Sequence, residues 1–299
     1  MARPLEIDNV VKNYGATQAL AGVSLSLEPG EVFGLLGPNG AGKTSLISII
    51  VTLEKLTAGR VKVFGHEVHS RQAKLNMGWV GQEVITTGFF SVEELMGFHS
   101  GYYGVKNPKA RVEELLNDLG LWEHRHKKVK QLSGGMKRRL MIAKALVHEP
   151  KLLLLDEPTA GVDVELRTKL WDFVEKLRRQ GISVLLTTHY LEEAERLCDR
   201  VAIIHKGLIR ATGGTRGLIE QWSRKKISIK LKEKLEGLTH PDLVKGSVDG
   251  LEWSFLTKMS KPLGELLQEL QIPQQALSDI KMEEGKLEDV FLSLTRGEA

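Results

Sequence analysis

The sequence predicts an α/β protein with a mainly parallel sheet, followed by a small α+β domain. Up to about residue 219, short apolar strands alternate with helical patterns, which is typical of a parallel sheet with helices on both faces. Beyond residue 220, period-2 strands and amphipathic helices occupy about 75 residues, enough for a modest core of their own. A chain of 299 residues also exceeds one average domain. We therefore expect two domains, at residues 1–219 and 220–299.

The N-terminal part begins with strands and leads into a buried helix. Apolar residues alternate along residues 23–27, so a strand is expected there, and Pro29-Gly30 ends it. Residues 31–36 are more continuously apolar, as is typical of a buried parallel strand. A glycine-rich loop follows. Residues 45–53 are apolar on most faces, which indicates a buried helix.

A helical subdomain is expected at about residues 90–147. Within it, Asn107 is a candidate N-cap and Pro108 suits the first helical position. An apolar stripe at helical spacing follows, and Gly120 closes it. Another helix is expected from residue 136 to residue 147. The helical subdomain is therefore inserted between two parts of the predicted sheet.

The remaining elements continue the alternation. The first domain should close with strand 151–155, helix 166–177, strand 182–187, helix 191–198 and strand 201–204. The second domain should contain strands at 227–231, 251–255 and 278–282, and helices at 263–270 and 287–294.

Composition narrows the class of protein. Hydrophobic residues make up 41% of the chain, which supports a real core, and the net charge of +4 is only mildly basic. Cys198 is the one cysteine, so an intrachain disulfide is excluded and a reducing compartment is favoured. The N-terminus lacks the pattern of a signal peptide, and no stretch approaches the ~18 apolar residues of a membrane span. We expect a soluble protein whose link to a membrane depends on a partner.

A phosphate-binding loop lies between the strand at 31–36 and the following helix. The pattern is Gly-x-x-x-x-Gly-Lys-Thr, and its glycines allow successive backbone N–H groups to face phosphate oxygens. Lys43 can reach the β- and γ-phosphates, and the Thr44 hydroxyl can bind Mg²⁺. The expected nucleotide-binding residues are Gly37, Asn39, Gly40, Ala41, Gly42, Lys43, Thr44 and Ser45.

Two carboxylates end the apolar strand at 151–155. Asp156 suits a contact to Mg²⁺, direct or through water, and Glu157 suits polarising an attacking water. An isolated Asp-Glu pair usually caps a helix, but a phosphate loop upstream favours the catalytic interpretation.

A second anion site is predicted where Leu132-Ser133-Gly134-Gly135-Met136 opens a helix. This motif, placed before the carboxylate pair, resembles the signature loop of the ATP-binding-cassette (ABC) ATPases. The resemblance covers about residues 5–215 and implies a P-loop NTPase fold that hydrolyses ATP to ADP and phosphate. In that family the signature loop of one subunit covers the γ-phosphate held by the other. The resemblance therefore implies a head-to-tail dimer in which Ser133, Gly134 and Gly135 also bind nucleotide.

Three further positions match the family singly. Tyr14 resembles the aromatic that stacks on adenine, although alone it is as consistent with packing. Gln82 resembles the glutamine that contacts Mg²⁺ and the attacking water. His189 resembles the switch histidine at the γ-phosphate, a residue that in isolation is more often structural. The implied catalytic set is thus Glu157, His189, Lys43 and Gln82, with Thr44, Gln82 and Asp156 as Mg²⁺ ligands.

The branch of the family is indicated by two shorter matches. Residues 287–292 and 135–139 resemble the ATPases of bacterial ABC-2-type exporters with a C-terminal extension. That resemblance implies separate integral membrane permease subunits, a homodimer or a pair with a second ABC ATPase, and a peripheral location on the cytoplasmic face of the cell membrane. Residues 83–90 depart from the usual pattern where the family meets its transporter. The aromatic residues of 82–103 could grip a permease or form a local core.

Two other functions stay open at this point. One is the ATPase of an importer, although importer tails are typically longer and barrel-like. The other is a non-transport ABC protein acting on ribosomes or nucleic acid. Such proteins carry two cassettes or long coiled coils, and the basic runs at 127–130 and 224–226 are short, so no nucleic-acid partner is expected.

Overall fold

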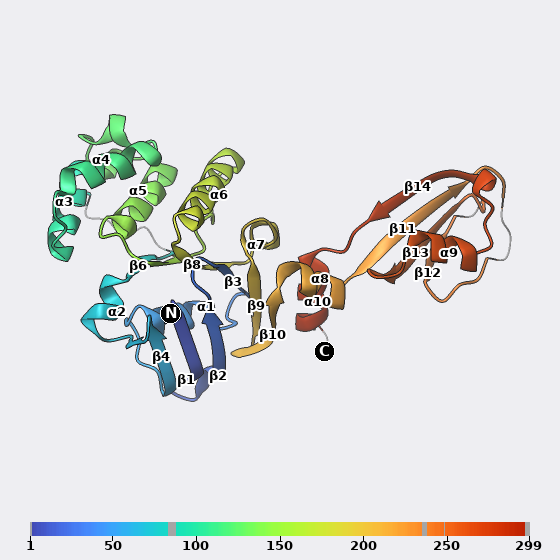
Figure 1. Ribbon diagram of the computed structural model, residues 1–299, viewed down its shortest axis with the longest axis horizontal. Coiled ribbons are helices and arrows are strands. Elements are labelled where there is room, and N and C mark those ends of the chain that lie inside the picture. Colours follow the sequence, from blue (N-terminus) through green and yellow to red (C-terminus); the bar gives the residue numbers. More distant parts are fainter. Residues whose placement is uncertain (1, 83–87, 235–237, 248, 297–299) are drawn as a thin grey trace. The chain divides into compact units, whose positions relative to one another are not determined.

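The computed structural model describes residues 2–82, 88–234, 238–247 and 249–296, and the chain divides into two compact units between Thr212 and Gly213 (Figure 1). The sequence had suggested a division at residue 219. The difference arises from helix α8 (Thr215–Trp222), which packs against the last helix, α10 (Leu287–Arg296), and therefore belongs to the second unit.

A six-stranded sheet in the order β10-β9-β3-β8-β7-β6 forms the centre of the first unit. Strands β9, β3, β8, β7 and β6 are joined by parallel pairings, which confirms the α/β prediction. The bounds are Val32–Leu36 (β3), Met77–Val80 (β6), Leu152–Asp156 (β7), Ser183–Thr188 (β8), Arg200–His205 (β9) and Leu208–Gly214 (β10). All residues of β3, β7 and β8 are buried, as their continuous apolar or small character requires.

One face of this sheet differs from the expectation of helices on both faces. A second, antiparallel sheet in the order β2-β1-β4-β5 covers it, with helix α1 (Lys43–Ile50) in the shared core. Its strands are Leu5–Tyr14 (β1), Thr17–Leu27 (β2), Ala58–Val63 (β4) and His66–Glu67 (β5). Because α1 is apolar around most of its circumference, it contacts both sheets at once.

Helices cover the opposite face. Leu153 and Leu155 of β7 point away from the core that contains Leu152 and Leu154, as the period of a strand requires. They lie against helices α5 (Gly134–Leu146), α6 (Val164–Arg179) and α7 (Leu191–Leu197), which line a small cavity beside them. The short helix α2 (Arg71–Leu75) precedes β6.

The expected helical subdomain contains α3 (Val92–Tyr103), α4 (Pro108–Asp118) and α5, with short 3₁₀ turns at Trp122–His124 and Val129–Gln131 (Figure 1). Ser91 and Glu94 form a reciprocal capping box at the start of α3. Asn107 is the N-cap of α4, but it adopts a left-handed conformation and its side chain makes no capping hydrogen bond within the described chain. Pro108 opens the helix as predicted.

The second unit is a four-stranded antiparallel sheet in the order β12-β13-β11-β14 with helix α9 on one face. Ile227, Ile229 and Phe255 lie in its core, which agrees with the predicted period-2 pattern, and Leu266 of the helix belongs to the same core. The elements are Arg224–Leu231 (β11), Leu243–Gly246 (β12), Glu252–Lys258 (β13), Leu263–Glu269 (α9), a 3₁₀ turn at Gln274–Ala276, and Leu277–Glu283 (β14). Throughout the described parts of both units, every helix is too short or too polar to cross a bilayer.

Candidate nucleotide-binding and hydrolysis site

The predicted phosphate loop connects β3 to α1 at the carboxyl edge of the parallel sheet, where ligands commonly bind in open α/β folds. A cavity of about 320 Å³ opens there. Its lining consists of Ala19, Asn39, Gly40, Gly42, Lys43, Thr44, Ser45, Gln82 and Glu157. The structure therefore brings most of the predicted loop together with two side chains from other strands.

Two glycines of the loop allow no side chain. Gly42 has a φ of 109°, and a Cβ atom there would lie 2.7 Å from the carbonyl oxygen of Ala19. A Cβ atom at Gly37 would lie 2.5 Å from the carbonyl oxygen of Ile204. The loop is thus wrapped tightly against its neighbours, and its shape depends on glycine at both positions.

Lys43 is buried inside the loop. Its ammonium group donates hydrogen bonds to the carbonyl oxygens of Gly37, at 2.7 Å, and Pro38, at 3.2 Å. It also lies 3.9 Å from a carboxylate oxygen of Glu157. Burial lowers the pKa of Lys43, while the charges of Glu157 and Asp156 oppose that shift. The cation is therefore held between the loop and the carboxylates, where a phosphate group would meet it.

The carboxylate pair ends β7 as predicted. Asp156 is buried and accepts a hydrogen bond from the Thr187 hydroxyl, and burial raises the pKa of Asp156 above its usual value. Glu157 has a φ of 47°, a left-handed conformation that is costly for a residue with a side chain. Its N–H donates to the carbonyl and hydroxyl oxygens of Thr187, at 3.0 and 3.1 Å. This turn points the Glu157 carboxylate into the cavity.

Two more predicted residues meet the Glu157 carboxylate. The Gln82 amide nitrogen donates to it at 3.3 Å, and His189 Nδ1 lies 3.3 Å from the same oxygen. Lys43 comes after β3, Gln82 follows β6 and His189 follows β8, so residues after three strands converge on the carboxylate that follows β7. The four predicted catalytic residues, Lys43, Gln82, Glu157 and His189, therefore form one cluster. Such a cluster can hold a phosphate group and accept a proton from a water beside it.

Two other sets of predicted nucleotide-binding residues do not line this cavity. The described residues that line it include neither Tyr14 nor the segment Ser133–Gly135. Tyr14 ends β1, and the ammonium of Lys12 lies 4.5 Å above the centre of its ring. Ser133 and Gly134 are exposed, and the Ser133 hydroxyl caps α5 by accepting the N–H of Met136 at 3.3 Å. The expected second anion site is thus a separate, solvent-facing helix start.

The proposed Mg²⁺ ligands offer only oxygen atoms of the kind that this ion prefers. Thr44 supplies a hydroxyl, Gln82 an amide oxygen and Asp156 a carboxylate. Among the described residues, no cluster of three or more His, Cys, Asp or Glu side chains could hold a metal by itself. The donor set therefore fits an ion that shares its coordination with phosphate oxygens, rather than one in a cage made of protein alone.

Sequence reasoning missed the role of Arg138. It appeared only within residues 135–139, the segment that resembles the exporter ATPases, yet it is 6% exposed and its side chain reaches the backbone on either side of Gln82 and Glu157. One signal was available: Arg138 shares helical spacing with the apolar Met141 and Ile142. An arginine on a buried helix face must find partners.

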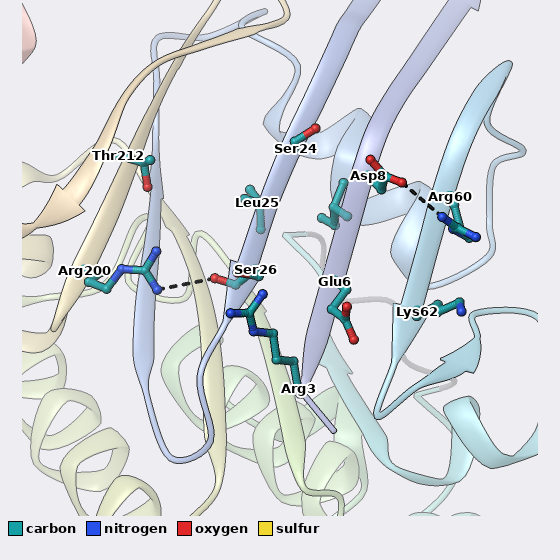
Figure 2. A pocket seen from close by; sticks show the side chains of 11 residues that line it. Arg3, Glu6, Asp8, Ser24, Leu25, Ser26, Arg60, Lys62, Arg200 and Thr212 are labelled. Carbon is teal, nitrogen blue, oxygen red and sulfur yellow. Dashed lines mark hydrogen bonds and ion pairs between the residues drawn. The ribbon is translucent and has the colours of Figure 1, made fainter. Parts of the chain in front are cut away.

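Another hollow, of about 470 Å³, lies on the outer face of the antiparallel sheet (Figure 2). The basic side chains around this hollow are already paired with carboxylates or carbonyls. Arg60 lies 3.2 Å from Asp8, and Arg200 contacts Glu31 at 3.3 Å and the carbonyl of Ser26 at 3.5 Å. It contains none of the predicted site residues, so the phosphate loop remains the candidate site.

Comparisons with known proteins identify the family of this chain. The sequence model of the family described as ABC transporter matches residues 20–160. Linearmycin resistance ATP-binding protein LnrL of Bacillus subtilis (strain 168) is 36% identical over 306 residues, covering 97% of this chain and 98% of that protein. Daunorubicin resistance ATP-binding protein DrrA3 of Streptomyces coeruleorubidus is 35% identical and covers 97% of this chain and 95% of its own length.

A solved structure described as the ATP-binding subunit of an ABC transporter superposes with a TM-score of 0.68 at 28% identity, covering 73% of this chain and 92% of that one. The fold is therefore that of an ABC-type P-loop NTPase, as predicted. Given this likeness and a relative that is 36% identical along nearly the whole chain, the protein belongs to the ABC transporter family of ATP-binding proteins, which are ATPases.

Proposed function

We propose that this chain is the ATP-hydrolysing subunit of a bacterial ABC-2-type exporter and powers transport through separate membrane subunits. The observation that carries this proposal is the convergence of Lys43, Gln82 and His189 on the Glu157 carboxylate. The similarity to proteins named for drug resistance and for Nod factor export supports export as the purpose of hydrolysis.

Hydrolysis at this cluster begins with a water beside Glu157. The carboxylate accepts a proton from the water as its oxygen forms a bond to the γ-phosphorus, and the bond to the oxygen of the ADP leaving group breaks. Gln82 orients the water, while Lys43 and the loop N–H groups stabilise charge on the phosphate oxygens. His189 contacts the γ-phosphate. Mg²⁺, held by Thr44, Gln82 and Asp156, neutralises part of the phosphate charge when bound.

The signature residues act in this proposal on a second subunit. Ser133 and Gly134 are exposed at the start of α5 and lie outside the cavity lined by Lys43, so within one chain the two anion sites are separate. In a head-to-tail pair, each chain places Ser133 over the γ-phosphate bound by the other. The partner is a second copy or another ABC ATPase. ATP closes the pair and hydrolysis reopens it, while Tyr14 stacks on adenine.

The surface for the permease is formed by aromatic residues around α3. Phe89, Phe98 and Tyr102 are 80%, 60% and 82% exposed, so these three side chains do not form the local core that the sequence allowed. Tyr103 is only partly exposed and stacks on His148, with ring centres 3.8 Å apart, and Phe90 packs edge-on against Phe98. Exposed aromatics in one segment are typical of a contact surface. Docking there would hold the ATPase at the cytoplasmic face of the membrane.

Affinity purification from gently solubilised native membranes tests this proposal. The tagged protein should recover a multi-span membrane protein, and the Phe98→Asp/Tyr102→Asp variant should lose it. Val244→Asp is the matched control, because Val244 is 63% exposed, close to the 60% of Phe98, but lies in the second unit. Recovery of ribosomal or nucleic-acid-binding proteins, unaffected by either variant, would contradict the transport function.

A further inference from the structure

A buried arginine connects the loop that carries Gln82 with the loop that carries Glu157. Arg138 lies in α5, and its guanidinium binds five backbone carbonyls. Nη1 donates to those of Gly81 and Gln82, Nη2 donates to those of Asp156 and Glu157 at 2.8 Å each, and Nε donates to that of Pro158 at 3.0 Å. Every nitrogen of the group is therefore used on main-chain oxygens.

The five carbonyls belong to two segments that the sequence separates widely. Residues 81–82 follow β6, and residues 156–158 include the end of β7 and the turn after it. These strands are parallel neighbours, with Val80 opposite Leu155. The guanidinium bridges these two segments at the point where each leaves the sheet. Its planar fork of donors suits this task, because fixed N–H directions fix the separation of the carbonyls.

Arg138 also holds the unusual backbone of Glu157. The peptide on one side of this left-handed residue is fixed through its N–H by Thr187, as described above. The carbonyls of Asp156 and Glu157 are fixed by Arg138. A left-handed residue with a side chain persists only where its surroundings hold it. Without the guanidinium, the Glu157 turn is free to relax, and with it the carboxylate that faces Lys43.

The electrostatic surroundings retain this buried cation. Burial lowers the pKa of Arg138, whereas the charges of Asp156, Glu193 and Glu157 raise it. An arginine stays protonated under such conditions. A lysine would bring the same charge but only three donors on one nitrogen, so it cannot bridge both segments in the same way.

We propose that Arg138 is a positioning residue that fixes Glu157 and Gln82 relative to each other and to the signature helix α5. The proposal rests on the proposed function, since it assumes that Glu157 and Gln82 act in hydrolysis. Because Ser133 caps the same helix, any displacement of the signature loop is transmitted through Arg138 to the Glu157 turn.

Steady-state ATPase kinetics of Arg138→Met and Arg138→Ala test this role. A misplacement of about 1 Å costs about 100-fold in rate, so we expect kcat to fall about 100-fold in both variants. The KM for ATP should change by less than about threefold, because Lys43 and the loop still bind the phosphates. Millimolar guanidinium ions should raise the kcat of R138A, which has an empty space, and leave R138M unchanged. A purely structural defect would not respond in this way.

Arg139→Ala is the matched control. Arg139 is the next residue of α5 but donates to the carbonyls of Leu119 and Gly120, away from the catalytic loops, so kcat should remain near the wild-type value. Glu157→Gln is measured beside it. Wild-type turnover in E157Q refutes the proposed function itself. Loss of turnover in E157Q together with wild-type kcat in R138A and R138M overturns only the role of Arg138.

Thermal melting and ATP binding of each variant show whether it folds. If R138A and R138M do not fold, Arg138→Lys retains a buried cation and serves in their place. We expect R138K to bind ATP normally and to have a reduced kcat. A wild-type kcat in R138K would then overturn the proposal.

Discussion

The left-handed conformation of Glu157 leads to a prediction that separates backbone strain from charge. Glu157→Ala and Glu157→Gly both remove the carboxylate and its contacts to Lys43, Gln82 and His189. They differ in that glycine accepts a φ of 47° without steric cost. An L-residue there costs about 1–2 kcal/mol. Glycine in turn stabilises the unfolded chain by about 0.4–1 kcal/mol. We therefore expect the Gly variant to be more stable than the Ala variant by about 1 kcal/mol.

The assay is thermal unfolding of the two variants without nucleotide. For a unit that ends at Thr212, a difference of about 1 kcal/mol corresponds to a higher Tm of about 2–4 °C for the Gly variant. Glu113 is the matched control, since it is exposed in the middle of α4. There the same pair of substitutions should reverse in sign, with Gly less stable by about 1 kcal/mol. An Ala variant at 157 as stable as the Gly variant would refute the strain at this turn.

Three further outcomes are expected. Lys43→Ala should weaken ATP binding itself, measured with a fluorescent ATP analogue, and unchanged affinity would count against the phosphate loop. Gly42→Ala should lower stability by about 1–3 kcal/mol in thermal melts and abolish ATP binding, because its Cβ would meet the carbonyl of Ala19. Burial, with the nearby charges of Lys144 and His148, lowers the pKa of His99 from 6.5 to about 4. The unfolded chain therefore takes up this proton first, and the free energy of unfolding should fall by about 1–3 kcal/mol as pH drops from 6.5 to 4. His99→Gln should remove that dependence in denaturant titrations, whereas substitution of the exposed His126 should not.

The sequence was most informative where chemistry fixes spacing. Gly37–Thr44 and Asp156-Glu157 were predicted from the apolar strands that they follow, whereas Gln82 and His189 were predicted only from the resemblance to the ABC ATPases. Their mutual contacts required the structure, since the sequence does not say which strands are neighbours. The order β3-β8-β7-β6 places these strand ends side by side.

Other features depend on partners that the sequence does not name. The alternating apolar residues in the strands of residues 5–63 predict one buried face, but they do not show what packs against it. The antiparallel sheet that packs on α1 was therefore not predicted. Arg138 binds main-chain carbonyls up to 57 positions away. Every residue has such a carbonyl, so the sequence cannot show which of them the arginine binds. The unit boundary lies after Thr212 rather than at residue 219, because α8 contacts α10, which is far away in the sequence at the end of the second unit.

The most direct test of the ATP-driven pair is the molar mass of Glu157→Gln, measured by light scattering with and without Mg·ATP. This variant should bind ATP while turnover falls about 10²–10⁴-fold, because the group that accepts the proton is lost. Its mass should rise from that of a 33.3 kDa monomer to twice that value when ATP is added. Addition of Ser133→Arg to the same variant should keep it monomeric. A monomer in ATP with wild-type turnover would contradict both the catalytic role of Glu157 and the shared site.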